Sequence, residues 1–236
     1  FTVTPSLASP TGRSLKFDGT DDFIRFDGQR VNLTAGYTLE GWFKTPSSGD
    51  YTIIAAVDPA DDSPQLSVYL EGGQLNAAHL GAIVSTSVAK DDNLWHHIAG
   101  VMDGNIYRIY LDGFFVDSII ASCNNPGSSS NMILGNHQAW SNGSGVSSWF
   151  EGLIDDVQIW NTALTQQEIQ SYMSTPPTGN EEGLVGYWDF NEGTGSTLTY
   201  QTSNGNDGTI YGATWSTDVP EETTTATNYS VQIGRA

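Results

Sequence analysis

The stretch Phe150-Glu-Gly-Leu-Ile-Asp-Asp-Val-Gln-Ile-Trp160 alternates like a β-strand and carries two adjacent acids in its middle. Adjacent strand residues point to opposite faces of a sheet, so we expect one of Asp155 and Asp156 to point toward the interior. A buried carboxylate without a partner is costly, and the chain holds only 8 Lys and Arg residues. This pattern therefore favours a hard cation as the partner. The expected faces of the strand are Leu153, Val157 and Ile159 against Ile154, Gln158 and Trp160.

A second acidic segment, Phe17-Asp-Gly-Thr-Asp-Asp-Phe23, stands far upstream. Ca²⁺ takes about six to eight oxygen ligands from carboxylates, backbone carbonyls and water, and a glycine-containing acidic turn supplies such a mixture. We predict that the two segments lie side by side and hold one structural Ca²⁺ ion. The alternative is a solvated acidic loop beside an aspartate that backbone N–H groups cap. The predicted ligands are Asp18, the Gly19 carbonyl, Asp22, Asp155 and Asp156.

The composition of the 236-residue chain indicates an all-β protein, with 26 Gly, 7 Trp, 10 Tyr and 9 Phe. One large sandwich domain fits this length, because such domains reach about 200–250 residues. The net charge of −19 argues against nucleic-acid binding and against anionic membranes, since both need a basic surface. No apolar run is long enough for a transmembrane helix, and the single Cys123 cannot form an intramolecular disulfide. The chain starts at Phe1, so we expect a processed piece of a longer protein with further domains.

Short alternating runs bounded by turn residues predict a two-sheet antiparallel β-sandwich, a jelly roll. Thr165 and Glu168 form a capping box that opens one short helix after the main strand series. We expect a single domain over residues 1–217, with 184–215 supplying closing strands, followed by a polar linker over 218–236. The alternative for 184–215 is a truncated second domain, which would leave Trp188 and Trp215 exposed.

Five segments, in this order, resemble the laminin-G-like jelly rolls of the concanavalin A-like lectin/glucanase superfamily. The resemblance implies two antiparallel sheets, often a structural Ca²⁺, and binding to glycans or other surface molecules, and it does not imply catalysis. The matching segments are Ser14–Phe23, Tyr37–Phe43, Trp95–Val101, Ile109–Gly113 and Phe150–Asn161 with Ala163-Leu-Thr165.

The loop over residues 135–148 has the composition of a sugar-binding loop, with one tryptophan in a polar, glycine-rich stretch. Aromatic faces stack on sugar C–H surfaces, and such sites lie on loops. Trp140 is the predicted exposed platform, and the alternative is a tryptophan folded back over the sandwich edge. The predicted ligand-binding residues are His137, Gln138, Trp140, Asn142 and Trp149.

No catalytic arrangement is recognisable in the sequence. Retaining glycosidases of this superfamily place acids two residues apart on one strand face, and the flanking glutamates of that pattern are missing around Glu151, Asp155 and Asp156. His96 and His97 are adjacent, so on a strand they point to opposite faces and cannot bind one metal ion.

We therefore predict a non-catalytic, lectin-like carbohydrate-binding module of a secreted or cell-surface protein, stabilised by calcium and directed to a polysaccharide. The alternatives are a protein-interaction or adhesion module and, third, a polysaccharide hydrolase or lyase.

Overall fold

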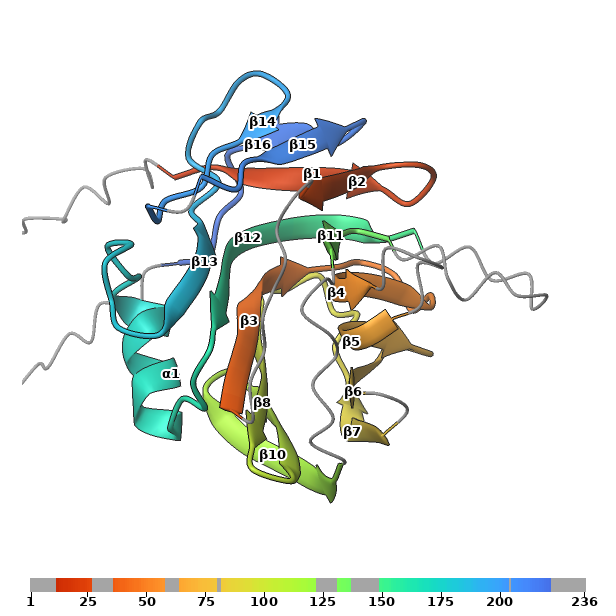
Figure 1. Cartoon of the computed structure of the whole chain (residues 1–236). Helices are drawn as coiled ribbons and strands as arrows, with labels where there is room; N and C mark the ends of the chain where they lie inside the picture. Colours follow the sequence, from red (N-terminus) through yellow and green to blue (C-terminus); the bar gives the residue numbers. More distant parts are fainter. Residues whose placement is uncertain are drawn as a thin grey trace, which may run out of the picture.

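The chain forms a two-layer antiparallel β-sandwich with one short helix, as the sequence predicts (Figure 1). The computed structural model describes residues 12–26, 36–57, 64–79, 82–121, 131–136, 149–203 and 205–221. Within these ranges the strands form two sheets, called sheet A and sheet B, and no helix is long and apolar enough to cross a membrane.

Sheet A has the strand order β10-β9-β8-β3-β12-β1-β16, and β13 also pairs with β12. Its long central strand β12 pairs with β3 along one edge and, in succession, with β1 and β13 along the other. The bounds are β1 Ser14–Asp18, β3 Gly36–Lys44, β8 His96–Asp103, β9 Ile106–Leu111, β10 Phe114–Ile120, β12 Glu151–Trp160, β13 Leu184–Trp188 and β16 Thr214–Ser216.

Sheet B has the order β14-β15-β2-β11-β4-β5-β6-β7. The strands β4 to β7 follow one another as antiparallel neighbours, while β2 and β11 come from distant parts of the chain. The bounds are β2 Phe23–Phe26, β4 Tyr51–Val57, β5 Pro64–Glu71, β6 Gln74–His79, β7 Ala82–Ala89, β11 Asn131–Leu134, β14 Thr197–Leu198 and β15 Gly208–Tyr211.

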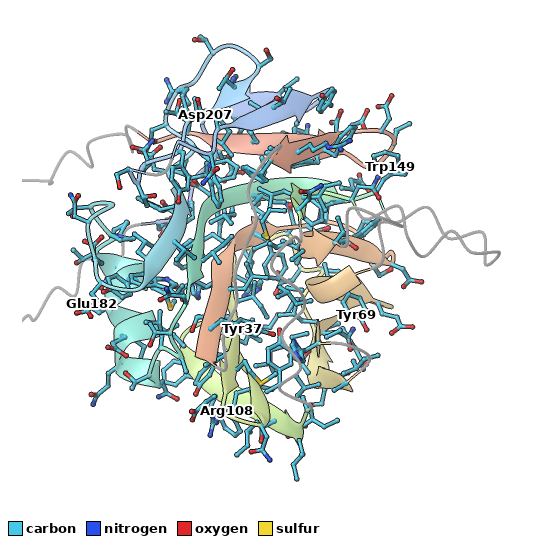
Figure 2. The ribbon with its side chains drawn as sticks, viewed as in Figure 1. Tyr37, Tyr69, Arg108, Trp149, Glu182 and Asp207 are labelled. Atoms are coloured by element: carbon cyan, nitrogen blue, oxygen red, sulfur yellow. The ribbon has the colours of Figure 1, made fainter. Side chains whose placement is uncertain are left out.

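The core lies between the two sheets and consists of the inward-facing residues of both. It includes Phe17, Phe43, Phe150 and Trp188, all fully buried. Tyr37, labelled in Figure 2, belongs to β3, and its hydroxyl lies 2.7 Å from His79 Nδ1 of β6, which links the two sheets inside the core. Because burying apolar surface is the main favourable term in folding, this core fixes the packing of the two sheets.

The C-terminal strands pair with both sheets. β13 and β16 extend sheet A beside β12 and β1, and β15 extends sheet B beside β2. Trp188 is fully buried. The contacts continue past residue 217, because the Asp218 carboxylate accepts hydrogen bonds from Lys44 Nζ at 2.7 Å and from Trp95 Nε1 at 2.8 Å. The domain bounds of 1–217 and 218–236 remain a prediction.

A bulge in β12 shifts the expected alternation of its side chains. Asp155 lies opposite Trp42 and Gln158 opposite Glu40, so β12 carries one extra residue between these two pairs. Asp156 adopts a φ of 47°, a left-handed conformation that aspartate tolerates better than most residues. The core face is therefore Ile154, Val157 and Ile159, and the expectation that Leu153 shares a face with Val157 is wrong.

The helix α1, Gln166–Ser174, lies on the outer side of sheet A (Figure 1). The capping box predicted from the sequence is present, since Thr165 accepts from the Glu168 N–H and the Glu168 side chain accepts from the Thr165 N–H. Ile169 and Leu164 pack with Trp160, whose ring stacks on Tyr172 at 4.6 Å. The helix thus forms a second, smaller core over the outer face of sheet A.

Candidate functional site

Asp155 and Asp156 lie where the partner strand of β12 changes. Along one edge of β12, β1 pairs as far as Ile154 and β13 begins to pair at Val157, which leaves the two aspartates between the partner strands. The bulge in β12 lies at this change of partner strand. The side chains of Asp155 and Asp156 both line one cavity of about 410 Å³, together with Tyr187 of β13 and Asp189, which follows it. The expectation that the two acids point to opposite faces is therefore not met. We call Asp155, Asp156 and Asp189 the bulge cluster.

The bulge cluster concentrates negative charge in a poorly solvated place. Asp155 is only 4 % exposed, and its Oδ1 accepts the Asp156 N–H at 2.9 Å. The Tyr187 hydroxyl donates to Asp156 Oδ1 at 3.0 Å. Burial and then the neighbouring carboxylates raise the pKa of Asp155 well above its ordinary value of 3.8, and burial raises that of Asp156 to about 7. No ion pair to these acids exists within the described ranges, so the carboxylates lack a balancing cation.

The acidic turn before β2 forms a separate group, here called the turn cluster. Carboxylate oxygens of Asp18, Asp21 and Asp22 lie within 4.8 Å of one another. Asp22 Oδ2 accepts the Asp18 N–H at 2.8 Å, and Asp18 Oδ1 accepts the Thr20 N–H at 2.8 Å. Two of these acids therefore hold the turn by accepting its own backbone N–H groups.

The structure places the two predicted acidic segments on adjacent strands, but it does not bring their acids together. Asp18 lies opposite Glu151, with Gly19 beside it, and Asp155 follows four residues further along β12. At about 3.3 Å per residue, that offset is about 13 Å, whereas ligands about 2.3–2.6 Å from one Ca²⁺ ion lie within about 5 Å of each other. The acids of the two segments are therefore too far apart along β12 to share one ion.

Three aromatic side chains meet at the end of the molecule that carries the β1–β2 turn. Phe23 of β2 stacks on Tyr211 of β15, with centroids 4.4 Å apart and planes within 10°. Trp149, just before β12, lies 6.1 Å from Phe23 at a tilt of 49° (Figure 2). Tyr211 is 42 % exposed, and the other two rings are half-buried. This arrangement, here called the aromatic edge, presents ring surface to solvent at the border of sheet B.

A small pocket adjoins the aromatic edge on the outer face of sheet B. The strands β2, β11 and β4 form its floor, because the side chains next to Ile24, Met132 and Ala56 point away from the core. Its volume is about 130 Å³. We call it the edge pocket, and its lining residues are Phe23, Arg25, Val57, Asn131, Met132, Ile133 and Asn136.

The predicted ligand-binding residues His137, Gln138, Trp140 and Asn142 lie outside the described residues. The chain enters and leaves this loop at Asn136 and Trp149, so both ends of the loop lie at the edge pocket and the aromatic edge. Phe23, Tyr211 and Asn131 could not be predicted from the sequence as neighbours, because they come from three strands that only the sheet pairing brings together. The same holds for Asp189, which follows β13 and lines the cavity with Asp155 and Asp156.

The adjacent histidines point to opposite faces, as expected, and both have structural contacts. His96 lies between Asp112 and Asp92. Burial alone would lower its pKa, but the two carboxylates outweigh burial, so the pKa of His96 is raised above its ordinary value. His97 is buried beside Glu40, with 3.8 Å between Nε2 and Oε2, and burial lowers its pKa to about 3.

Residues 18–170 of this chain match the model of a laminin G-like family, which is described as the concanavalin A-like lectin/glucanases superfamily. A curated relative from rat, the sushi, von Willebrand factor type A, EGF and pentraxin domain-containing protein 1, is 28 % identical over 195 residues. The match covers 78 % of this chain, and the chain spans about 5 % of the length of that relative.

Solved structures show the same fold. A candidate carbohydrate-binding protein from Bacteroides ovatus superposes with a TM-score of 0.68 at 16 % identity, covering 89 % of this chain and 61 % of that one. A heptameric pentraxin from Limulus polyphemus superposes with a TM-score of 0.61 at 18 % identity, covering 85 % and 94 %. At these identities the likeness is one of fold.

Proposed function

The chain belongs to the concanavalin A-like lectin/glucanases superfamily, and we propose that it is a non-catalytic carbohydrate-binding module stabilised by calcium. Its ligand is a polysaccharide or glycan, and its place is in a larger secreted or cell-surface protein. A linked module of this kind raises the local concentration of its neighbouring domains at the glycan.

The aromatic edge carries the glycan part of this proposal. Tyr211 is one of few large aromatic side chains in the described part of the chain that expose more than a third of their surface, and it stacks on Phe23 beside a pocket with two amides, Asn131 and Asn136. Ring faces bind the C–H surface of a sugar, while amides serve as both donor and acceptor for hydroxyl groups. The Bacteroides protein with the same fold is itself described as a candidate carbohydrate-binding protein, which supports this reading.

The bulge cluster supports the calcium part better than the turn cluster does. Its carboxylates share a cavity, Asp155 is 4 % exposed, and no ion pair reaches them within the described residues, whereas Asp18 and Asp21 of the turn cluster are exposed to water. A divalent ion would neutralise the bulge cluster and supply the missing attraction. We therefore propose that Ca²⁺ binds at Asp155 and Asp156, with Asp189 lining the same cavity, although the three carboxylates that already lie within 4.8 Å of one another are those of the turn cluster.

Affinity electrophoresis tests the glycan proposal. The protein should migrate more slowly in native gels that contain a polysaccharide it binds, across a panel of laminarin, xylan, galactomannan, pectin and mucin, with serum albumin as the control. EDTA should weaken the retardation if calcium holds the module together. Unchanged migration in every gel would contradict glycan binding and favour the protein-interaction alternative.

A calcium titration tests the metal assignment. An ion present at 100 times its Kd stabilises the folded state by about 2.7 kcal/mol. For a domain of this size, that free energy corresponds to a rise in Tm of about 5–10 °C. Equal melting temperatures in EDTA and in millimolar CaCl₂ would contradict a structural calcium ion.

A further inference from the structure

The edge pocket differs in charge from the rest of the protein. The chain holds 27 acidic and 8 basic residues, yet Arg25 is the only charged side chain among the described residues that line this pocket. Two larger cavities, of about 460 and 410 Å³, are each lined by at least three acids. Because a hollow lined by one sign of charge attracts ligands of the opposite sign, the edge pocket favours an anionic group.

The strand pairing fixes Arg25 at the edge pocket. Its two neighbours in β2 are fully buried in the core, so Arg25 and Phe23 share the outer face of sheet B. Arg25 lies opposite Ile133 of β11 on one side and opposite Thr209 of β15 on the other. The backbone of Arg25 is therefore held from both sides, while its side chain is exposed and lines the pocket.

The guanidinium group of Arg25 matches a carboxylate in both charge and shape. It is planar and always charged, and two of its N–H groups can donate in parallel to the two oxygens of one carboxylate. Arg25 also has a contact within the protein. Since a guanidinium carries five N–H donors, it can keep that contact and still bind a ligand carboxylate.

The surroundings of Arg25 indicate that this carboxylate belongs to a sugar. Phe23 stands two residues away on the same strand face, at about 7 Å, and its ring stacks on Tyr211. Asn131 adds an amide that can donate to and accept from hydroxyl groups. The volume of about 130 Å³ lies well below the roughly 300–1,000 Å³ of pockets that enclose drug-sized ligands. The pocket therefore takes the charged end of one sugar residue, and the remainder lies along the aromatic edge.

We propose that the edge pocket binds the carboxylate of an acidic sugar, a uronic or a sialic acid, with the carboxylate on Arg25 and the sugar ring against Phe23. This inference rests on the proposed glycan function and adds to it the class of ligand. The net charge of −19 does not prevent such binding, because salt at physiological concentration screens exposed charges beyond about 8 Å. The charge that lines the pocket therefore decides which ligand binds.

Titration calorimetry with matched pairs of sugars tests the ligand class. The pairs are the methyl glycosides of glucuronic acid and glucose, those of galacturonic acid and galactose, and sialyllactose with lactose. We expect the full chain to bind the acidic member of at least one pair about tenfold or more tightly, as a charge-assisted hydrogen bond provides. The pair that shows this preference distinguishes a uronic acid from a sialic acid.

Two outcomes of the titration would overturn the carboxylate assignment. The first is binding of the neutral member that equals or exceeds binding of the acidic member in every pair. The second is binding of galactose 6-sulfate as tight as that of the preferred acidic sugar, since any anion would then suffice. If the full chain binds neither these probes nor any polysaccharide of the electrophoresis panel, the glycan function fails and this inference fails with it.

The variant Arg25→Gln tests the role of the guanidinium. It should reduce the affinity ratio within the preferred pair to about one, whereas Arg25→Lys keeps the charge without the planar fork and should retain part of the preference. Because both members of a pair are measured on the same variant, a loss of stability does not imitate this result. An unchanged ratio in Arg25→Gln would overturn the pocket assignment and leave the glycan function in place.

The matched control is Lys16→Gln. Lys16 is an exposed base of β1 in sheet A, so this substitution removes the same charge from the other sheet. The affinity ratio should stay as in the unsubstituted chain. A ratio that falls equally in Lys16→Gln and Arg25→Gln would show that net charge, and not the edge pocket, sets the preference, and it would overturn the proposal.

Discussion

Replacing Glu40 by Gln should make the protein less sensitive to alkaline pH. Glu40 lies on the outer face of sheet A under α1 and is fully buried, and its Oε1 accepts a hydrogen bond from Trp160 Nε1 at 3.0 Å. Its Oε2 has no hydrogen bond, and the nearest base, His97, is held neutral by burial. Burial raises the pKa of Glu40 from 4.5 to about 8, so the carboxyl is protonated at neutral pH.

The size of the effect follows from the two pKa values. The folded protein keeps the Glu40 proton up to about pH 8, whereas the unfolded chain releases it near its ordinary value of 4.5. The free energy of unfolding therefore falls as pH rises between these values, by about 1.4 kcal/mol per pH unit and about 5 kcal/mol in total. Glutamine has no proton to release and lacks this slope. Relative to the unsubstituted protein, Glu40→Gln should gain about 3 kcal/mol between pH 5 and pH 7, and close to the full amount by pH 9.

Urea unfolding at pH 5, 7 and 9, followed by tryptophan fluorescence and far-UV circular dichroism at a fixed calcium concentration, measures this difference. The comparison at equal pH cancels the titration of His97 and of the bulge cluster, because both proteins share them. The pH-independent offset between the two side chains also cancels. A difference in stability that does not grow between pH 5 and pH 9 would refute the reasoning.

Three further predictions concern the bulge cluster, β12 and α1. Asp155→Asn should abolish the rise in Tm that CaCl₂ causes. In EDTA its Tm should be equal to that of the unsubstituted protein or higher, because the substitution removes repulsion between buried carboxylates. The control Asp22→Asn should keep the calcium response, and the reverse pattern would place the ion in the turn cluster. Gly152→Ala should lower the free energy of unfolding in urea by more than about 2 kcal/mol, because φ is 149° and the new Cβ would lie 2.1 Å from the Lys44 carbonyl oxygen. Gly72→Ala, at a φ of 56° with open space around it, should lower it by about 1 kcal/mol. Equal losses in the two variants would contradict the steric argument. Thr165→Ala should lower the free energy of unfolding by about 1 kcal/mol, because the N-cap of α1 is lost, while Thr165→Ser should change it little. An alanine variant of unchanged stability would show that tertiary packing alone holds α1.

The features that the sequence predicts correctly are those that depend on near neighbours. The alternating strand runs and the Thr165–Glu168 capping box each depend on residues only a few positions apart. The family, too, is recognisable from short segments in a fixed order, and the match over residues 18–170 confirms it.

The errors in β12 have one physical cause. An alternating sequence predicts faces only while the strand stays regular, and a single bulge moves every later residue to the other face. The bulge at Asp155–Asp156 forms where β1 gives way to β13, and no local pattern marks that change of partner.

The chain composition and its local patterns were enough to determine an all-β sandwich and a helix with its cap, while the calcium site that they predict stays a prediction. Only the tertiary structure decided which acids share a cavity, since the offset between Asp18 and Asp155 is set by the pairing register of β1 and β12. It likewise assembled the edge pocket from β2, β4, β11 and the residue after Gly135. The physical reason is that strand propensity comes from neighbouring residues, whereas a site on a sheet face depends on which distant strands pair and in what register.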